Sequence, residues 1–173
     1  MTKRIIRWLV TASLLLAAIP SAAQGNDPAG LRAQTSFGIR AAGSYLLEVL
    51  HEGFPPAAAL VTLTRDGGFL STDVSDFGAG GLSTIDSPVH GTWKATGPRT
   101  LEATTFYFGF DEDGIPIWIA RSKGQFEFDA EFRSGSGSLV VERFTFEQDP
   151  LDPSEVPADR LAATMTARRI SSD

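Results

Sequence analysis

The stretch TFYFGFDEDGIPIW, residues 105–118, places aromatic and branched apolar residues on both sides of a short acidic segment. The segment DEDG fits a type I turn closed by a glycine, because Gly114 can adopt a positive φ without steric cost. Asp111 and Asp113 resemble the start of a calcium-binding loop, but the residues that follow offer no further oxygen ligand, so no metal site is predicted. The stretch therefore predicts a β-hairpin whose aromatic flanks face a core or a ligand.

Short runs rich in Val, Thr, Phe and Leu continue on both sides of this hairpin and alternate with turn residues. No long stretch beyond residue 42 shows the 3.6-residue period of an amphipathic helix. Most links are short, which predicts an all-β, antiparallel up-and-down meander, and closure into an eight-stranded barrel removes the exposed sheet edges. A two-sheet sandwich is the alternative fold. The expected strands cover residues 43–50, 58–65, 68–74, 89–96, 100–110, 115–128, 134–147 and 160–170.

The lengths of the links predict a barrel with one open end. The links after the second, fourth and sixth strands are short, whereas those after the first, third and seventh cover residues 51–57, 74–88 and 148–159. Alternate links of a meander lie at the same end, so the DEDG turn joins the long loops around a mouth, and a barrel of this size can hold one small ligand. The residues expected at this mouth are His51, His90, Asp111 and Asp113.

Strand alternation predicts which side chains face the barrel interior. Phe106, Phe108 and Phe110 face inward if Asp111 pairs with Ile115, and this register is favoured because DEDG suits a bulged turn. A shift of one residue would turn the same rings outward and create a Phe/Ile patch, which would need a cover from the leader or from a second subunit. The predicted ligand-facing residues are Tyr45, Trp93, Phe106, Phe108, Phe110, Trp118, Phe126, Phe128 and Met165.

Residues 1–23 have the features of a cleaved signal peptide: basic residues, an apolar run too short to span a bilayer comfortably, and small residues at the cleavage point. A secreted or periplasmic protein is expected, with residues 24–42 as a leader, partly disordered or a short helix, and residues 43–170 as the barrel domain. Cleavage removes three of the 15 basic residues and none of the 21 acidic ones, so the formal charge changes from −6 to −9. This charge disfavours nucleic acid as a partner, and no membrane insertion is expected. The chain has no cysteine, which excludes disulfides and thiolate chemistry.

The segment GTWKATGPRTLEATTFYFGFDEDG, residues 91–114, resembles a largely uncharacterised family of small exported bacterial proteins with lipocalin-like (calycin-type) β-barrels. The resemblance implies an eight-stranded barrel over residues 43–170 and implies little about chemistry. Lipocalins proper carry Gly-x-Trp on the first strand and an Arg near the end of the last strand. In this chain Gly43, Ser44 and Tyr45 stand at the position of Gly-x-Trp, and Arg168 or Arg169 stands at the position of the Arg. The residues that match the family's pattern are Gly91, Trp93, Thr96, Gly97, Phe110, Asp111, Asp113 and Gly114.

Three functions remain open from the sequence. An aromatic-lined barrel with a mouth favours a protein that binds a small apolar or amphipathic molecule, with no cofactor. An enzyme is less favoured because no nucleophile motif is present, but a cofactor-free cyclase or isomerase could use the same barrel, with Tyr45, Tyr107 or a mouth acid as its proton partner. The third is a periplasmic interaction protein or protease inhibitor that acts through the leader or the loops. A homo-oligomer could form through an outer Phe/Ile face.

Overall fold

The computed structural model of the protein describes residues 28–77 and 85–171. The predicted signal peptide, residues 1–23, lies outside the described residues and stays a prediction. None of the described helices is long and apolar enough to cross a bilayer.

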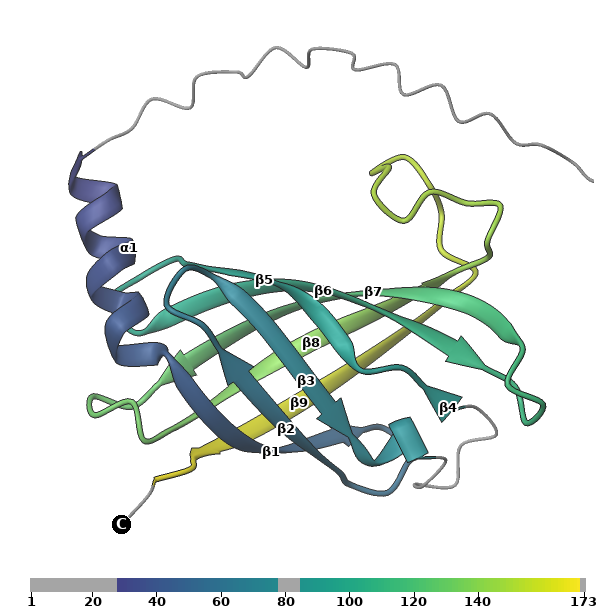
Figure 1. Ribbon diagram of the computed structural model, residues 1–173, viewed down its shortest axis with the longest axis horizontal. Helices are drawn as coiled ribbons and strands as arrows, with labels where there is room; N and C mark the ends of the chain where they lie inside the picture. Colours follow the sequence, from purple (N-terminus) through teal and green to yellow (C-terminus); the bar gives the residue numbers. More distant parts are fainter. Residues whose placement is uncertain (1–27, 78–84, 172–173) are drawn as a thin grey trace, which may run out of the picture.

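Eight antiparallel strands close into an up-and-down barrel (Figure 1). Each strand pairs with the next one along the barrel, and the first pairs with the last through Tyr45↔Arg169 to His51↔Ala163, which closes the sheet. The predicted barrel is confirmed, and the sandwich alternative is wrong. A further two-residue strand, β4 (Ile85–Asp86), pairs with the mouth end of β6. The barrel strands are β1 (Gly43–His51), β2 (Ala57–Leu63), β3 (Gly68–Asp73), β5 (Val89–Ala95), β6 (Thr100–Phe110), β7 (Pro116–Phe128), β8 (Ser134–Phe144) and β9 (Asp159–Arg169).

The helix α1 (Pro28–Ala41) lies across one end of the barrel and closes it (Figure 1). Phe37 points from the helix into the barrel and is 4% exposed. Its ring centroid lies 5.5 Å from that of Trp93 and 5.3 Å from that of Phe132, so the helix completes the core at this end. We call this the closed end. The leader thus supplies a plug for the barrel.

Two contacts hold α1 close to the strands. The side-chain oxygen of Gln34 accepts a hydrogen bond from the backbone N–H of Ala95 at 2.7 Å. A Cβ on Gly38 would lie 2.5 Å from the carbonyl oxygen of Arg65, so only glycine allows the helix to approach the β2–β3 turn this closely. The position of the plug is therefore set by backbone contact as well as by the Phe37 ring.

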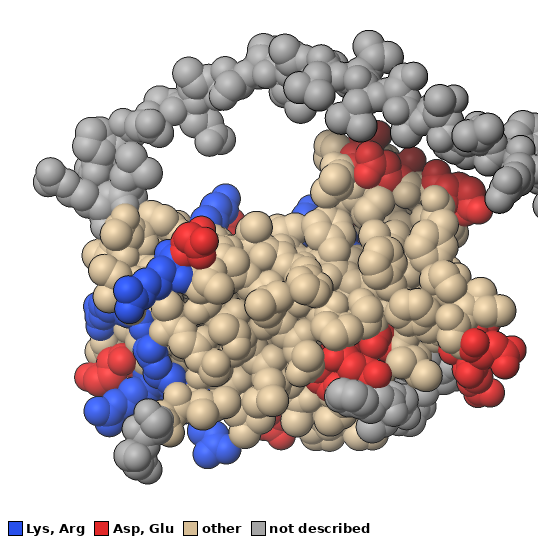
Figure 2. Space-filling view, viewed as in Figure 1, with Lys and Arg blue, Asp and Glu red and all other residues tan. Residues whose placement is uncertain are grey.

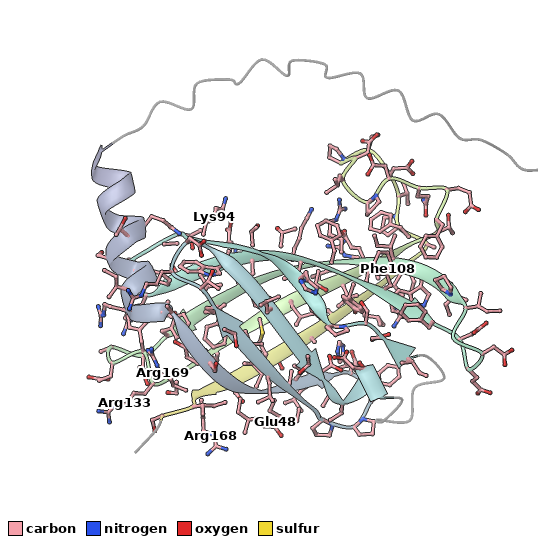
Figure 3. All side chains as sticks on the ribbon, viewed as in Figure 1. Glu48, Lys94, Phe108, Arg133, Arg168 and Arg169 are labelled. Carbon is pink, nitrogen blue, oxygen red and sulfur yellow. The ribbon has the colours of Figure 1, made fainter. Side chains whose placement is uncertain are left out.

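Arg169 fastens the end of the helix to the last strand. Its guanidinium donates to the carbonyl oxygens of Arg40, at 2.7 Å, and Ala42, and it lies 5.7 Å from the centre of the Tyr45 ring. These carbonyls belong to the last turn of α1 and the residue after it, where backbone acceptors lack helical partners. Of the two arginines that the sequence left open, Arg169 contacts the first strand, while Arg168 points away from the barrel (Figure 3).

Replacing Arg169 with alanine is expected to lower the free energy of unfolding by about 1–2 kcal/mol, because the exposed carbonyl of Arg40 and the partly buried carbonyl of Ala42 lose charge-assisted hydrogen bonds. Urea denaturation followed by tryptophan fluorescence measures the change. Arg168→Ala, at the neighbouring exposed position, should change stability by less than about 0.5 kcal/mol. An equal effect of the two substitutions would show that Arg169 does not hold the plug.

The predicted inward orientation of Phe106, Phe108 and Phe110 is wrong. The tip of the hairpin pairs as expected, with Phe110 opposite Pro116, but a bulge follows, and Gly109 lies opposite Trp118. Residue 117 is the extra residue, and beyond it the register is shifted by one. A Cβ on Gly109 would lie 2.1 Å from the Trp118 indole, so the glycine makes room for that ring on the inner face. The Phe row is therefore turned to the outside.

The loop after β8, residues 145–158, covers part of this outer face. The ring of Phe146 stacks against that of Phe108 at 6.4 Å, and Phe144 beneath the loop is fully buried. Arg121 forms an ion pair of 2.8 Å with Glu142 and also donates to the carbonyl of Pro150. Within the described chain, the cover over this outer Phe/Ile patch thus comes from the loop and not from the leader, and it is partial. Phe108 remains 44% exposed, and a homo-oligomer through this face stays a prediction.

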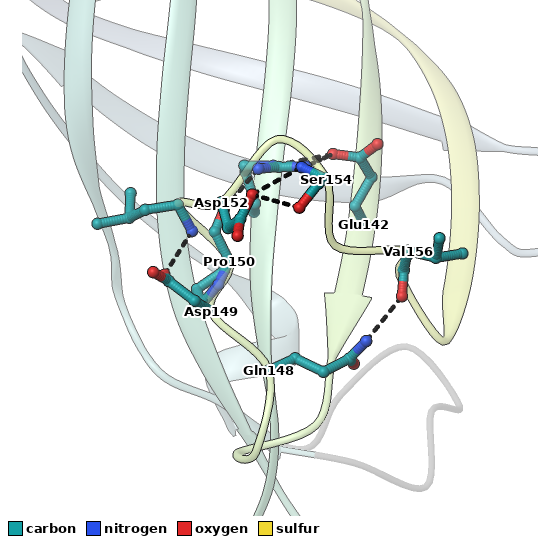
Figure 4. A network of polar contacts seen from close by, with 9 residues as sticks. Glu142, Gln148, Asp149, Pro150, Asp152, Ser154 and Val156 are labelled. Atoms are coloured by element: carbon teal, nitrogen blue, oxygen red, sulfur yellow. Dashed lines mark hydrogen bonds and ion pairs between the residues drawn. The ribbon is translucent and has the colours of Figure 1, made fainter.

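Polar contacts within this loop keep it folded (Figure 4). Asp152 accepts hydrogen bonds from the backbone N–H and the hydroxyl of Ser154, at 2.8 and 2.7 Å. The side-chain amide of Gln148 donates to the carbonyl of Val156 at 2.7 Å and so bridges the two halves of the loop. The loop therefore has an internal scaffold that supports the cover over Phe144.

Candidate ligand-binding cavity

The barrel encloses a cavity of about 510 Å³ that opens at the end opposite α1. Cavities of this size hold small organic molecules in other proteins. The wall is mostly apolar, and polar side chains gather at the open end, which we call the mouth. The apolar wall includes Leu47, Val61, Leu101, Phe126, Val141 and Leu161.

Small inward-facing residues leave this space open. Ala59, Ala103 and Gly124 line the middle of the barrel, where longer side chains would meet across it. The large rings are concentrated at the closed end instead, where Phe126, Phe128 and Phe132 pack with centroid distances of 4.8 and 5.0 Å. The interior is therefore a filled core beside the plug and a hollow chamber toward the mouth.

The structure divides the predicted ligand-facing residues into three groups. Tyr45, Phe126, Phe128 and Met165 line the cavity. Trp93 faces inward but is buried against α1 below the chamber. The remaining members of the set lie at or outside the mouth: Trp118 on the inner side, and Phe106, Phe108 and Phe110 on the outer face.

The predicted mouth residues are only partly at the cavity. His51 lines it. His90 is exposed on the outer face of β5, the orientation that strand alternation predicts for it, and it does not line the cavity. Asp111 and Asp113 belong to the hairpin turn at the mouth end but not to the cavity wall. Asp111 accepts the backbone N–H groups of Asp113 and Ile115 at 3.0 and 2.8 Å, so its carboxylate supports the turn. Across residues 28–77 and 85–171, no three His, Cys, Asp or Glu side chains are grouped to hold a metal ion.

Three residues that sequence reasoning missed form a polar cluster at the mouth. Asp73 ends β3, Ser75 lies in the short 3-10 helix η1 (Val74–Phe77), and Asp86 lies in β4. The Ser75 hydroxyl contacts Oδ1 of Asp73 and lies 3.1 Å from Oδ2 of Asp86. The sequence signal for this cluster was the pairing of Ser with Asp within the predicted loop 74–88, at Ser75-Asp76 and at Asp86-Ser87.

The cluster carries more acceptors than protons. One hydroxyl proton can serve only one carboxylate, yet Ser75 bridges two of them. The pKa of Asp86 is raised from its ordinary value of 3.8 to about 6, chiefly by burial and also by the charges of Asp73 and Asp76. The Ser75 hydrogen bond and the charge of Arg143 act in the opposite direction. The pKa of Asp86 thus lies close to neutral pH.

The mouth also carries Tyr107 from β6, Arg143 from β8 and His51 from β1. Burial raises the pKa of Tyr107 well above its ordinary value, and the charge of Asp86 acts in the same direction. Arg143 stacks over the Trp118 ring at 4.7 Å and forms an ion pair of 3.3 Å with Asp159. Burial lowers the pKa of His51, which favours its neutral form. The mouth therefore combines the carboxyl acceptors of Asp73 and Asp86 with the guanidinium donor of Arg143.

Asp86→Asn is expected to stabilise the ligand-free protein at pH 7.5 by about 1–2 kcal/mol, allowing for solvent screening at this partly exposed site. The folded-state pKa is raised above the unfolded value, so the ionised carboxyl opposes folding above pH 6 and has no such effect below about pH 4. The gain should therefore shrink as the pH falls from 7.5 to 4. Thermal unfolding at several pH values measures it.

Asp113→Asn, at an exposed turn position, is the control and should show no such pH-dependent gain. A constant difference between wild type and Asp86→Asn across this range would contradict the elevated pKa.

Comparison with known proteins adds no assignment of the site. No family model matches the chain, and no curated protein matches it. Among solved structures, the chain is similar to one described as "Structure of EF1p2_mFAP2b bound to DFHBI", with a TM-score of 0.48 and 11% sequence identity. The similarity covers 80% of this chain and 98% of the other. At that level of similarity no residue of this cavity is assigned a role by comparison.

Proposed function

We propose that the protein binds a small amphipathic molecule, with the apolar part inside the barrel and the polar part at the mouth. The observation that carries this proposal is the unfilled 510 Å³ chamber, which is apolar along its wall and polar at its opening. Keeping this space open forgoes the dispersion contacts and apolar burial that larger side chains would supply at Ala59, Ala103 and Gly124. A ligand would restore those contacts.

The proposal includes export. A signal peptide over residues 1–23 would place the barrel in the periplasm or outside the cell, and the absence of cysteine suits a fold stabilised by burial alone. A distant relationship to calycin-type barrels fits the Gly43, Tyr45 and Arg169 contact at the closed end. There the Arg169 guanidinium lies 5.7 Å from the centre of the Tyr45 ring. A Cβ on Gly43 would lie 2.8 Å from a terminal nitrogen of the same guanidinium, so glycine leaves room for it.

The geometry favours binding over the two alternatives. The Tyr45 hydroxyl donates to the carbonyl of Ala41 at 2.8 Å at the closed end, and Tyr107 has a raised pKa, so neither is poised to exchange a proton at neutral pH. An inhibitor that acts through the leader would need that segment free, whereas residues 28–41 form the plug. Both alternatives would therefore have to use the mouth loops.

Titration of the mature protein with Nile red, an uncharged apolar dye, tests the proposal. Saturable binding of one dye per chain, displaced by decanol and accompanied by a change in Trp118 emission at the mouth, is the expected result. Native mass spectrometry of protein purified from its own host should show a retained small molecule. Absence of saturable dye binding together with an unliganded mass would overturn the proposed function.

A further inference from the structure

The polar groups at the mouth show which kind of ligand head group the site is built to take. Three side chains that line the cavity each hold a buried polar atom without a hydrogen-bond partner among the described residues: His51 Nδ1, Asp86 Oδ1 and Arg143 Nε. Buried polar atoms are almost always partnered in folded proteins, and leaving one unpartnered is costly. Three such atoms at the opening of one cavity indicate that a ligand supplies the partners.

The two charged members of this group, Asp86 and Arg143, lack opposite kinds of hydrogen-bond partner. Asp86 offers an acceptor and stands on the β4 wall, whereas Arg143 Nε is a donor and stands on β8. The charge of Arg143 lowers the pKa of Asp86, so the two groups interact, yet the ion pair that Arg143 makes within the described chain is with Asp159. Asp86 Oδ1 and Arg143 Nε therefore do not hydrogen-bond to each other, and a donor and an acceptor at the mouth remain unpartnered.

The surroundings disfavour a ligand with a single full charge. The mouth end of the molecule is rich in acidic side chains, whereas basic ones gather at the closed end (Figure 2). An anionic head group would face Asp73 and Asp86, and its partner Arg143 is already shared with Asp159. A cationic head group would satisfy Asp86 but would lie within the field of Arg143 and leave its Nε–H unpartnered. A neutral head group with an adjacent donor and acceptor meets both requirements without transferring a charge out of water.

We propose that the mouth recognises an uncharged carboxamide-type head group on an apolar molecule, with its N–H directed to Asp86 and its carbonyl oxygen directed to Arg143. Trp118, under the Arg143 guanidinium, holds that side chain over the opening. His51, neutral at physiological pH, supplies a further acceptor at the edge of the same site. This inference rests on the proposed function, since it names the polar end of the molecule whose apolar part fills the barrel.

Competition against Nile red with four ligands of equal chain length tests the inference: decanamide, decanol, decylamine and decanoate. Decanamide is expected to bind about tenfold more tightly than decanol, because it completes two further hydrogen bonds, and more tightly than either charged ligand. In Asp86→Ala the preference for decanamide over decanol should fall to within about twofold, and saturable Nile red binding shows that the barrel of the variant is intact. Asp113→Ala, at the same end of the barrel but outside the cavity, should keep the full preference.

Urea denaturation followed by tryptophan fluorescence reports whether each variant is folded. If Asp86→Ala does not fold, Arg143→Lys provides the second test, because it keeps the charge and removes the Nε–H donor, and it too should lose most of the preference. Equal binding of decanamide and decanol by wild type, or tighter binding of decylamine or decanoate, would overturn the head-group inference and leave the proposed function intact. Failure of all four ligands to bind would overturn the proposed function itself.

Discussion

Replacing Phe37 with alanine is expected to lower the free energy of unfolding by about 3–5 kcal/mol, the largest stability effect that we foresee in this protein. Phe37 contacts Trp93, Phe128 and Phe132 with centroid distances between 5.3 and 6.1 Å, and it is the aromatic ring by which α1 fills the closed end. Its removal leaves a cavity among Trp93 of β5, Phe128 of β7 and Phe132 of the β7–β8 turn, and the two rings on strands cannot collapse into it. Urea denaturation monitored by tryptophan emission measures the loss directly, since Trp93 lies in the affected core.

Ile39→Ala is the matched control on the same helix. Ile39 is 57% exposed, so this substitution should change stability by less than about 0.5 kcal/mol while removing apolar atoms of similar kind. Comparable effects of Phe37→Ala and Ile39→Ala would contradict the assignment of α1 as a plug. They would indicate that the barrel is stable without the helix.

Ala103→Phe is expected to lower the affinity for an apolar ligand by more than about tenfold, with little change in stability. Ala103 faces the cavity from β6, opposite Gly124 on β7, and a benzyl group there would occupy the space that the ligand needs. The new ring buries apolar surface in an existing void, which offsets the strain of adding it. Nile red titration gives the affinity, and urea denaturation shows that the variant remains folded.

Thr104→Phe is the control for this prediction. Thr104 is the next residue on β6 and faces outward between Thr92 and Lys123, so a ring at this position cannot enter the chamber. Its dye affinity should equal that of the wild type. Equal affinity in Ala103→Phe would mean that the dye binds outside the barrel, for example on the partly exposed Phe108 face, and that the chamber is not the binding site.

The positions of the strands and the two ends of the barrel could be read from the sequence because their causes are local. Alternating apolar residues specify a half-buried strand, and turn residues such as the DGG segment at 66–68 specify where it reverses. The predicted eight strands agree with the observed ones to within a few residues, the largest difference being the end of β8 at Phe144. Loop lengths then separate the mouth from the closed end, because a meander places alternate links together.

The orientation of Phe106 and Phe108 could not be read in the same way. It depends on one extra residue in β7 beside Gly109, and a pairing shift of one residue exchanges the two faces of a strand. Two uniform registers could be read from the sequence, and the observed pairing beyond the bulge, with Phe108 opposite Ile119, is neither of them. Local turn chemistry favoured the wrong face for the Phe row. What decided the outcome was the packing of Trp118 onto Gly109, a contact between two strands.

The sequence by itself determined the antiparallel strands and the loop-rich end of the meander, because strand period, turn residues and link lengths act over a few residues. Only the tertiary structure decided where the hollow lies and what surrounds its opening. The chamber exists because small residues from β2, β6 and β7 meet at one level, and the mouth site exists because Asp73, Asp86 and Arg143 arrive there from three separate elements. Such meetings depend on closure of the whole sheet, which no local stretch of sequence specifies.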